Sequence, residues 1–133
     1  MATPTDSADI ITAAREAAER AHAPYSGWHV GAVAVFAEGD EWYPGANVEN
    51  GSYGLTICAE RTAICAGVVA GRRKLVRVAL TCRDQHGRPV PTIVPCGACL
   101  QVMAEFGSPD TEIVIDGAGT FRLADILPRP FAL

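Results

Sequence analysis

The sequence lacks the features that mark membrane-spanning, secreted and disordered chains. No stretch of its 133 residues approaches the roughly 20 consecutive apolar residues that a membrane helix needs. Residues 1–9 are polar and acidic, without the basic start of a secretory signal. With 49% hydrophobic residues, the chain is also too apolar for a disordered protein. We therefore expect one globular domain over residues 1–133, located in the cytoplasm and without a membrane partner.

Positive charge is scarce as well. Lys and Arg total 11 against 15 Asp and Glu, which gives a formal net charge of −4. A protein that holds nucleic acid mainly through its phosphates is expected to be basic, so this balance argues against nucleic acid as a partner. A chain of this length buries about two-thirds of its unfolded surface, so a core can form without a disulfide scaffold.

The spacing of apolar residues predicts alternating helices and strands. The expected helices span residues 7–22, 58–70, 96–106 and 123–127. The expected strands span residues 28–37, 41–48, 75–82 and 112–116. Asp6 and Ser7 are candidate N-caps of the first helix, and the second helix is apolar on all sides and therefore expected to be buried. This order predicts an α/β fold with a mixed sheet between helices.

Cysteine is present in an odd number, five, so these residues cannot all pair with one another within the chain. In a reducing compartment, grouped cysteines indicate metal binding or catalysis more often than disulfides. Cys96 and Cys99 form a C-x-x-C at the start of an expected helix, where the helix N-terminus favours thiolates. By itself this pattern leaves two interpretations open, a zinc site and a redox pair.

A second motif, upstream, favours catalytic zinc. Cys58 begins the other central helix, and Glu60 follows two residues later. Three thiolates leave one tetrahedral position of zinc open for water, and an unligated carboxylate beside it can take a proton from that water. We therefore assign Cys58, Cys96 and Cys99 to zinc and Glu60 to proton transfer. This constellation is known from zinc nucleobase deaminases.

These motifs resemble those of the cytidine deaminases, in particular the small homotetrameric type. The resemblance covers nearly the whole chain and is carried by Pro24-Tyr25-Ser26, Asn47-Val48-Glu49-Asn50, Tyr53-Gly54, Cys58-Ala59-Glu60, Pro95 to Val102, and Leu127-Pro128 with Phe131. It implies a three-layer α-β-α fold with a five-stranded mixed sheet. It also implies zinc-dependent hydrolytic deamination of cytidine and 2′-deoxycytidine in pyrimidine salvage, by a homotetramer whose active sites are completed by neighbouring subunits.

The resemblance implies substrate-binding roles for individual residues. Asn47 and Glu49 correspond to a pair that hydrogen-bonds the ribose 3′-hydroxyl. Gly51 and Tyr53 correspond to residues that reach into an adjacent subunit's site near the 5′-hydroxyl. Phe131 corresponds to an aromatic residue that packs over the base from another subunit.

Further positions near the motifs follow from the same resemblance. Trp28 stands where relatives usually have Phe in the substrate pocket, and Ala59 belongs to the same substrate-binding set. Arg61 corresponds to an arginine that hydrogen-bonds the zinc thiolates and offsets their charge. Leu100 departs from the family pattern, since relatives often have Arg there, so charge compensation is left to Arg61 and the helix dipoles.

Two other deaminase functions share parts of this pattern. Trp28 and Leu100 keep open a deaminase of a modified cytosine nucleoside such as blasticidin S, whereas Asn47 and Glu49 argue for an unmodified ribose. A polynucleotide deaminase has the same zinc chemistry. The net charge of −4 and a first ligand that is Cys instead of His argue against it.

A non-catalytic zinc module is the alternative from another class. It needs a fourth protein ligand, for which Cys65 is the only nearby candidate. Cys65 lies two helical turns, roughly 10 Å, beyond Cys58, which is too far to share one ion. We therefore expect Cys65 and Cys82 to pack in the core.

Overall fold

A computed structural model describes residues 7–133 of the chain. Its helices are α1 (Ser7–Ala18), α2 (Ala59–Val69), α3 (Gly97–Phe106) and α4 (Leu123–Ile126), with a short 3-10 helix η1 (Tyr53–Leu55). Its strands are β1 (His29–Phe36), β2 (Trp42–Ala46), β3 (Leu75–Arg83), β4 (Glu112–Ile115) and β5 (Gly119–Arg122). Ser7 is the first helical residue of α1, and the N-cap candidate Asp6 lies outside the described residues. Within 7–133, none of the helices has the length and apolar character that crossing a membrane requires.

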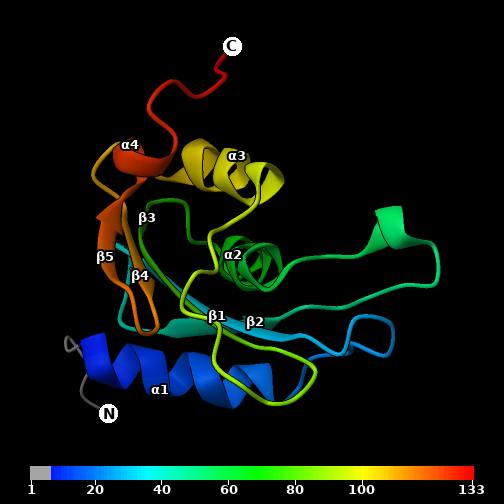
Figure 1. Ribbon diagram of the computed structural model, residues 1–133. Coiled ribbons are helices and arrows are strands. Elements are labelled where there is room, and N and C mark those ends of the chain that lie inside the picture. The colour runs from blue at the N-terminus through cyan, green and yellow to red at the C-terminus, as the bar shows by residue number, and fades with distance from the viewer. Residues whose placement is uncertain (1–6) are drawn as a thin grey trace.

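The five strands form one mixed sheet in the order β2-β1-β3-β4-β5 (Figure 1). β1 pairs antiparallel with β2 and β3, and β4 pairs antiparallel with β5. β3 and β4 run parallel, because α3 carries the chain back across the sheet between them. Pro44 lies in the edge strand β2, where a missing N–H donor is tolerated. The expected mixed sheet is confirmed, including the fifth strand that only the family resemblance implied.

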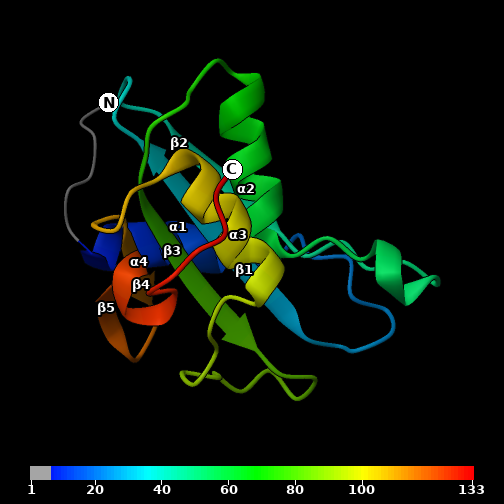
Figure 2. The same ribbon diagram turned by 90° about the horizontal axis from the view of Figure 1, so that it is seen from above.

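Helices cover both faces of the sheet and make three layers (Figure 1). On one face α1 packs against β1 and β3. On the other face lie α2, α3 and α4, and Figure 2 shows α2 and α3 side by side over the strands. The larger core cluster is on this second side and includes Phe36, Ile64, Leu80, Met103 and Ile113. Because α2 and α3 both start at the same end of this core, their N-termini meet.

Glycine allows two helices to lie directly on β1. A Cβ atom at Gly31 of β1 would lie 2.0 Å from the carbonyl oxygen of Ala14 in α1. A Cβ atom at Gly67 of α2 would lie 2.1 Å from Cε1 of Phe36 in β1. Any larger residue at either position would force the helix away from the sheet.

The first helix ends four residues before its predicted end at His22. After Ala18 the chain turns, with the N–H of Arg20 donating to a carbonyl three residues back at 3.0 Å. The N–H of His22 then donates to the carbonyl oxygen of Asn47 at 3.0 Å, and His22 forms a bridge with Val48. This pairing with a distant segment replaces the last helical turn that the apolar spacing predicted.

The helix α2 is buried on one face only. Its inward side chains are Ala59, Glu60, Ala63, Ile64 and Gly67. On the opposite face Cys65 is exposed and Val69 is 88% exposed. The prediction of a helix buried all round is therefore wrong for the single chain, as is core packing of Cys65. Cys82 is buried in β3, as predicted.

Candidate metal centre and active site

Three cysteine side chains meet where α2 and α3 begin. Cys58 and Cys96 are the N-cap residues of these two helices, and Cys99 lies in the first turn of α3. The three Sγ atoms lie within 4.8 Å of one another. The Sγ atom of Cys96 lies 3.9 Å from that of Cys58 and 3.4 Å from that of Cys99. The positive ends of both helix dipoles are therefore directed at the sulfur atoms, which favours thiolates.

This cluster has the donors and the spacing that zinc requires. Tetrahedral zinc with Zn–S bonds of about 2.3 Å places its sulfur ligands roughly 3.8 Å apart, close to the separations found here. Thiolates are soft ligands that zinc prefers. Among the described residues, no fourth His, Cys, Asp or Glu joins the group. Cys58, Cys96 and Cys99 would thus hold the ion and leave one position for water or substrate, as in catalytic zinc sites.

Arg61 supplies positive charge to the cluster. Its Nη2 atom donates a hydrogen bond to Sγ of Cys58 at 3.4 Å. A hydrogen bond with Cys99, and then the bond from Arg61, lower the pKa of Cys58 to about 5. The pKa of Cys99 is raised, first by its hydrogen bond with Cys58 and then by burial. Leu100 packs into the core and adds no charge. Deprotonation of the other two cysteines therefore depends on a bound cation that offsets their negative charge.

Glu60 is a buried carboxyl next to these sulfur atoms. It lies in the first turn of α2 and is only 4% exposed. Burial is the main reason why the pKa of Glu60 is raised to about 7, and the nearby Cys58 thiolate raises it further. A carboxyl with a pKa near neutrality can both accept and release a proton at pH 7.

A cavity of about 340 Å³ opens beside the cluster. The N-cap residues of α2 and α3 and the first turn of α2 contribute Cys58, Cys96, Ala59 and Glu60. The remaining lining residues come from the entrance of β1 and from two loops, and are Ser26, Trp28, Val30, Asn47, Glu49, Thr56, Ile93 and Val94. A cavity of this volume suits a small organic molecule.

The apolar pair Ile93 and Val94 was not expected at the site. Residues 84–92 are mostly polar in the sequence, yet this pair immediately precedes Pro95-Cys96 and forms part of the cavity wall. An apolar pair directly before a zinc motif was the signal in the sequence. Ile93 and Val94 thus place two apolar side chains beside Cys96, one of the expected zinc ligands.

Asn47 lines the cavity and also fixes the start of β1. Its Oδ1 atom accepts a hydrogen bond from the N–H of Val30, and its Nδ2 atom donates to the carbonyl oxygen of Trp28, both at 2.9 Å. Asn47 is buried, so these bonds satisfy an amide that would otherwise be costly to bury. The residue therefore positions the backbone on both sides of His29.

Glu49 holds the turn before β1. Its Oε1 atom accepts hydrogen bonds from the backbone N–H groups of Tyr25 at 3.0 Å and Ser26 at 3.1 Å, and its Oε2 atom accepts one from the Ser26 hydroxyl. The bond from that hydroxyl is the largest cause of a lowered pKa of Glu49. The carboxylate thus stays charged at the rim of the cavity.

Three of the expected substrate-binding residues lie apart from this cavity. Gly51 and Tyr53 belong to the loop between β2 and α2, which extends away from the sheet in Figure 1. Tyr53 is 74% exposed, and its ring meets that of Tyr25 edge-on at 5.8 Å. Phe131 is 69% exposed near the C-terminus, where its carbonyl oxygen accepts a hydrogen bond from Gln101 at 3.1 Å. Their roles stay predictions that require a second subunit.

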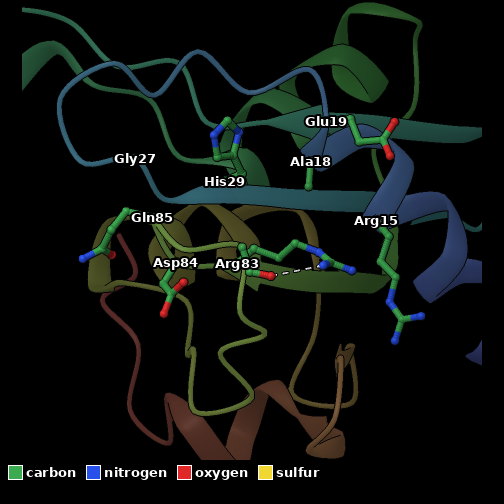
Figure 3. A pocket seen from close by; sticks show the side chains of 9 residues that line it. Arg15, Ala18, Glu19, Gly27, His29, Arg83, Asp84 and Gln85 are labelled. Atoms are coloured by element: carbon green, nitrogen blue, oxygen red, sulfur yellow. Dashed lines mark hydrogen bonds between the residues drawn. The ribbon is translucent and has the colours of Figure 1, made fainter.

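A larger cavity, of about 570 Å³, lies beside α1 and the loop after β3 (Figure 3). No cysteine lines it. Two of its charged side chains already have partners, since Arg15 pairs with Asp116 at 2.7 Å and Arg83 donates to the carbonyl oxygen of Gly87 at 3.2 Å. The smaller cavity, with the thiols and Glu60, has the chemistry of an active site.

The three-layer fold, the open three-thiolate cluster and the buried carboxyl together define a zinc enzyme of the nucleobase-deaminase class. Comparison with known proteins agrees. Residues 4–115 match the family model described as the cytidine and deoxycytidylate deaminase zinc-binding region, and the chain belongs to this family. The expected family and its zinc cofactor are thereby confirmed.

Individual relatives resemble almost the whole chain. The cytidine deaminase of Halalkalibacterium halodurans is 46% identical over 126 residues, which cover 92% of this chain and 91% of that protein. The cytidine deaminase of Mycobacterium tuberculosis is 44% identical over 121 residues, covering 90% and 85%. The crystal structure of cytidine deaminase from Burkholderia pseudomallei has a TM-score of 0.82 and 42% identity, covering 93% of this chain and 98% of that one.

Proposed function

We propose that this chain catalyses the hydrolytic deamination of cytidine and 2′-deoxycytidine to the corresponding uridines, with release of ammonia. The observation that carries the proposal is the buried carboxyl of Glu60 beside the three-cysteine cluster, in a cavity of about 340 Å³. Relatives with 44% and 46% identity are named cytidine deaminases, which supports the same substrate class.

The residues of the site divide the reaction between them. Cys58, Cys96 and Cys99 would hold the zinc, whose Lewis-acid chemistry makes a water molecule acidic enough to lose a proton near pH 7. Glu60 accepts that proton and delivers protons to N3 and to the leaving amino group of the cytosine ring. The burial of Glu60 supports this role because it brings the pKa of the carboxyl to about 7.

Other residues bind and orient the nucleoside. Trp28, Ala59, Asn47 and Glu49 all line the cavity. In this proposal Asn47 and Glu49 receive the ribose 3′-hydroxyl. Their internal hydrogen bonds use one of the two amide N–H groups of Asn47 and three of the about four acceptor sites on the carboxylate of Glu49. Both side chains therefore retain capacity for a ligand hydroxyl.

The active form in this proposal is a homotetramer in which neighbouring subunits complete each site. Large apolar side chains that are exposed by 65% or more in the single chain include Tyr53, Leu55, Val69 and Phe131. Association that covers these side chains would stabilise the assembly by removing apolar surface from water. Gly51 and Tyr53 would lie near the 5′-hydroxyl in one neighbouring site, and Phe131 over the base in another.

The proposal further takes the chain as a single domain that works in the cytoplasm. Both core clusters pack on the same five-stranded sheet, which supports one folding unit. The three cysteines of the site must stay reduced to bind zinc, and a reducing compartment provides that condition.

The loss of ultraviolet absorbance on mixing zinc-loaded protein with a nucleoside tests the activity. Cytidine, 2′-deoxycytidine and blasticidin S are compared side by side, with zinc content measured on the same sample. We expect turnover of the first two. A preference for blasticidin S would replace the proposal with deamination of a modified nucleoside, which the larger ring of Trp28 suggests. A fully zinc-loaded protein that turns over none of them would support the non-catalytic zinc module, in which the metal only stabilises the fold.

A further inference from the structure

The Trp28 indole is held by a residue that is distant in the sequence. Its Nε1 atom donates a hydrogen bond to Oε1 of Gln85 at 2.8 Å. Trp28 lines the cavity beside the cysteine cluster, whereas Gln85 lines the larger cavity shown in Figure 3. Gln85 is not among the residues that line the catalytic cavity, so it acts on that cavity through Trp28.

The backbone of Trp28 is fixed independently of Gln85. Its N–H donates to Oγ of Ser26 at 3.0 Å, and its carbonyl oxygen accepts from Nδ2 of Asn47 at 2.9 Å. What remains free is rotation about the side-chain torsions, and the indole N–H is the only polar group that can restrain it. The bond to Gln85 therefore selects the orientation of the ring.

Gln85 itself stands on a tight turn. The Oδ1 atom of Asp84 accepts hydrogen bonds from the N–H groups of His86 at 2.9 Å and Arg88 at 3.0 Å. Gly27 lies against Gln85 with a φ of +71°, and a Cβ atom at this position would come within 2.8 Å of Cβ of Gln85. The close approach of these two loops brings the Gln85 amide to the indole.

We propose that Gln85 is a positioning residue that orients the Trp28 indole and thereby shapes the nucleoside pocket. The inference rests on the proposed function in so far as the ligand is a nucleoside. An indole without its partner samples other rotamers that narrow or open the cavity, so nucleoside binding suffers more than proton transfer at Glu60. The coupling depends on the indole, because a phenylalanine ring has no donor for Gln85.

Steady-state kinetics in two backgrounds test this coupling. Q85L keeps the approximate size of the side chain but cannot accept a hydrogen bond, whereas Q85E still can. We expect Q85L to raise KM for cytidine about two- to tenfold, the size of one neutral hydrogen bond, while kcat stays within about twofold. Q85E is expected to keep a KM near that of the wild type.

The same Q85L substitution in a W28F background is expected to have no further effect on KM, because the partner of the amide is already gone. An equal rise of KM in the W28F background would overturn the inference, since Gln85 would then act through general loop structure. An unchanged KM in Q85L alone would overturn it as well.

Fluorescence tests the orientation of the ring without any turnover. The chain has two tryptophans, and W42F leaves Trp28 as the only one while removing no hydrogen bond. We expect Q85L in this background to lower the fluorescence anisotropy of Trp28 and Q85E to preserve it. Unchanged anisotropy in Q85L refutes the positioning role. A wild-type protein inactive on cytidine would refute the proposed function instead, and the anisotropy would still decide the role of Gln85.

Discussion

The carboxyl of Glu60 is costly to ionise where it lies. It is buried and faces a thiolate at Cys58, and both conditions disfavour a negative charge. An ordinary exposed carboxylate is too weak a base to exchange protons efficiently at neutral pH. The buried position that makes ionisation of Glu60 costly therefore also suits this carboxyl for proton transfer at neutral pH.

Removing this carboxyl separates metal binding from catalysis. E60A is expected to retain zinc, because all three sulfur ligands remain, and to lose turnover by a factor of about 10² to 10⁴, the usual contribution of general acid–base catalysis. Absorbance assays and metal analysis of one sample measure both properties. E16A, which removes an exposed glutamate from α1, is the control. Substantial turnover by E60A would contradict the role given to Glu60.

Arg61 controls the competition between protons and metal for the cluster. Its guanidinium lowers the pKa of Cys58, so in R61Q that thiol takes up its proton at a higher pH. We expect half of the zinc to be released roughly one pH unit higher than in the wild type as the solution is acidified. A colorimetric chelator follows the release, and R88Q, which changes an exposed arginine, is the control. Identical release curves would show that the helix dipoles alone offset the thiolate charge.

The contact between α2 and β1 depends on the absence of a side chain at position 67. G67A is expected to destabilise the protein by about 1 to 3 kcal/mol, because the new methyl group overlaps the ring of Phe36. Urea denaturation measures the change. G54A is the matched control, since a Cβ atom there meets no other atom within 4 Å. Equal stability of the two variants would mean that α2 can shift away from the sheet without loss.

A charged clamp joins α1 to the sheet. The guanidinium of Arg15 donates two hydrogen bonds to Asp116, each at 2.7 Å, and the Thr81 hydroxyl donates a third at 2.8 Å. The bond from Arg15, followed by the bond from Thr81, lowers the pKa of Asp116 below its ordinary value. Asp116 therefore stabilises the fold above its unfolded-state pKa of about 3.9, and this contribution is lost as the pH falls through the lower folded-state value.

This clamp predicts a pH-dependent effect of D116N. The variant is expected to unfold at a lower temperature than the wild type at pH 7, and the difference is expected to close under strongly acidic conditions. Thermal unfolding followed by circular dichroism at several pH values measures it. D110N removes the ion pair of Asp110 with Arg122 and is expected to have a smaller effect, because the carboxylate of Asp110 is far more exposed than that of Asp116. A D116N deficit that is the same at every pH would rule out the carboxylate as its cause.

Periodicity predicted the elements that contribute apolar residues to the two core clusters. α2, α3, β1 and β3 have continuous apolar patterns, and the structure has them within one or two residues of the expected bounds. Apolar spacing did not predict β5, because Gly119–Arg122 is short and mostly polar. This segment forms a strand through its pairing with β4. The end of α1 was not predicted for a similar reason, since the N–H of His22 donates to the carbonyl oxygen of Asn47, 25 residues away in the sequence.

The same distinction holds at the candidate site. The cysteine cluster was predictable because helix geometry places Cys96 and Cys99 on one side, and the motif with Glu60 is equally local. Gln85 was not predictable, because its contact with Trp28 depends on which two loops meet in the folded chain. Contacts between distant loops leave no periodic trace in the sequence.

Shared active sites would make activity a property of the assembly. E60A and F131A are each expected to have little activity alone. In the proposed tetramer, mixed assemblies would contain sites that combine Glu60 of one subunit with Phe131 of another, so refolding the two variants together is expected to restore measurable turnover. A mixture of E60A with the double variant E60A/F131A, which cannot rebuild such a site, is the control. A fully active monomer in sedimentation and kinetics would contradict the shared site.

The closeness of the three sulfur atoms links metal supply to redox chemistry. Cys96 is exposed, and its Sγ atom lies 3.4 Å from that of Cys99. A chain that loses its metal while hydrogen peroxide is present can join these two thiols as a disulfide, because the peroxide takes up the two electrons and two protons that the thiols release. Added zinc alone does not reverse this state, since a thiol reductant has to open the disulfide first. Bound metal therefore protects the site from oxidation.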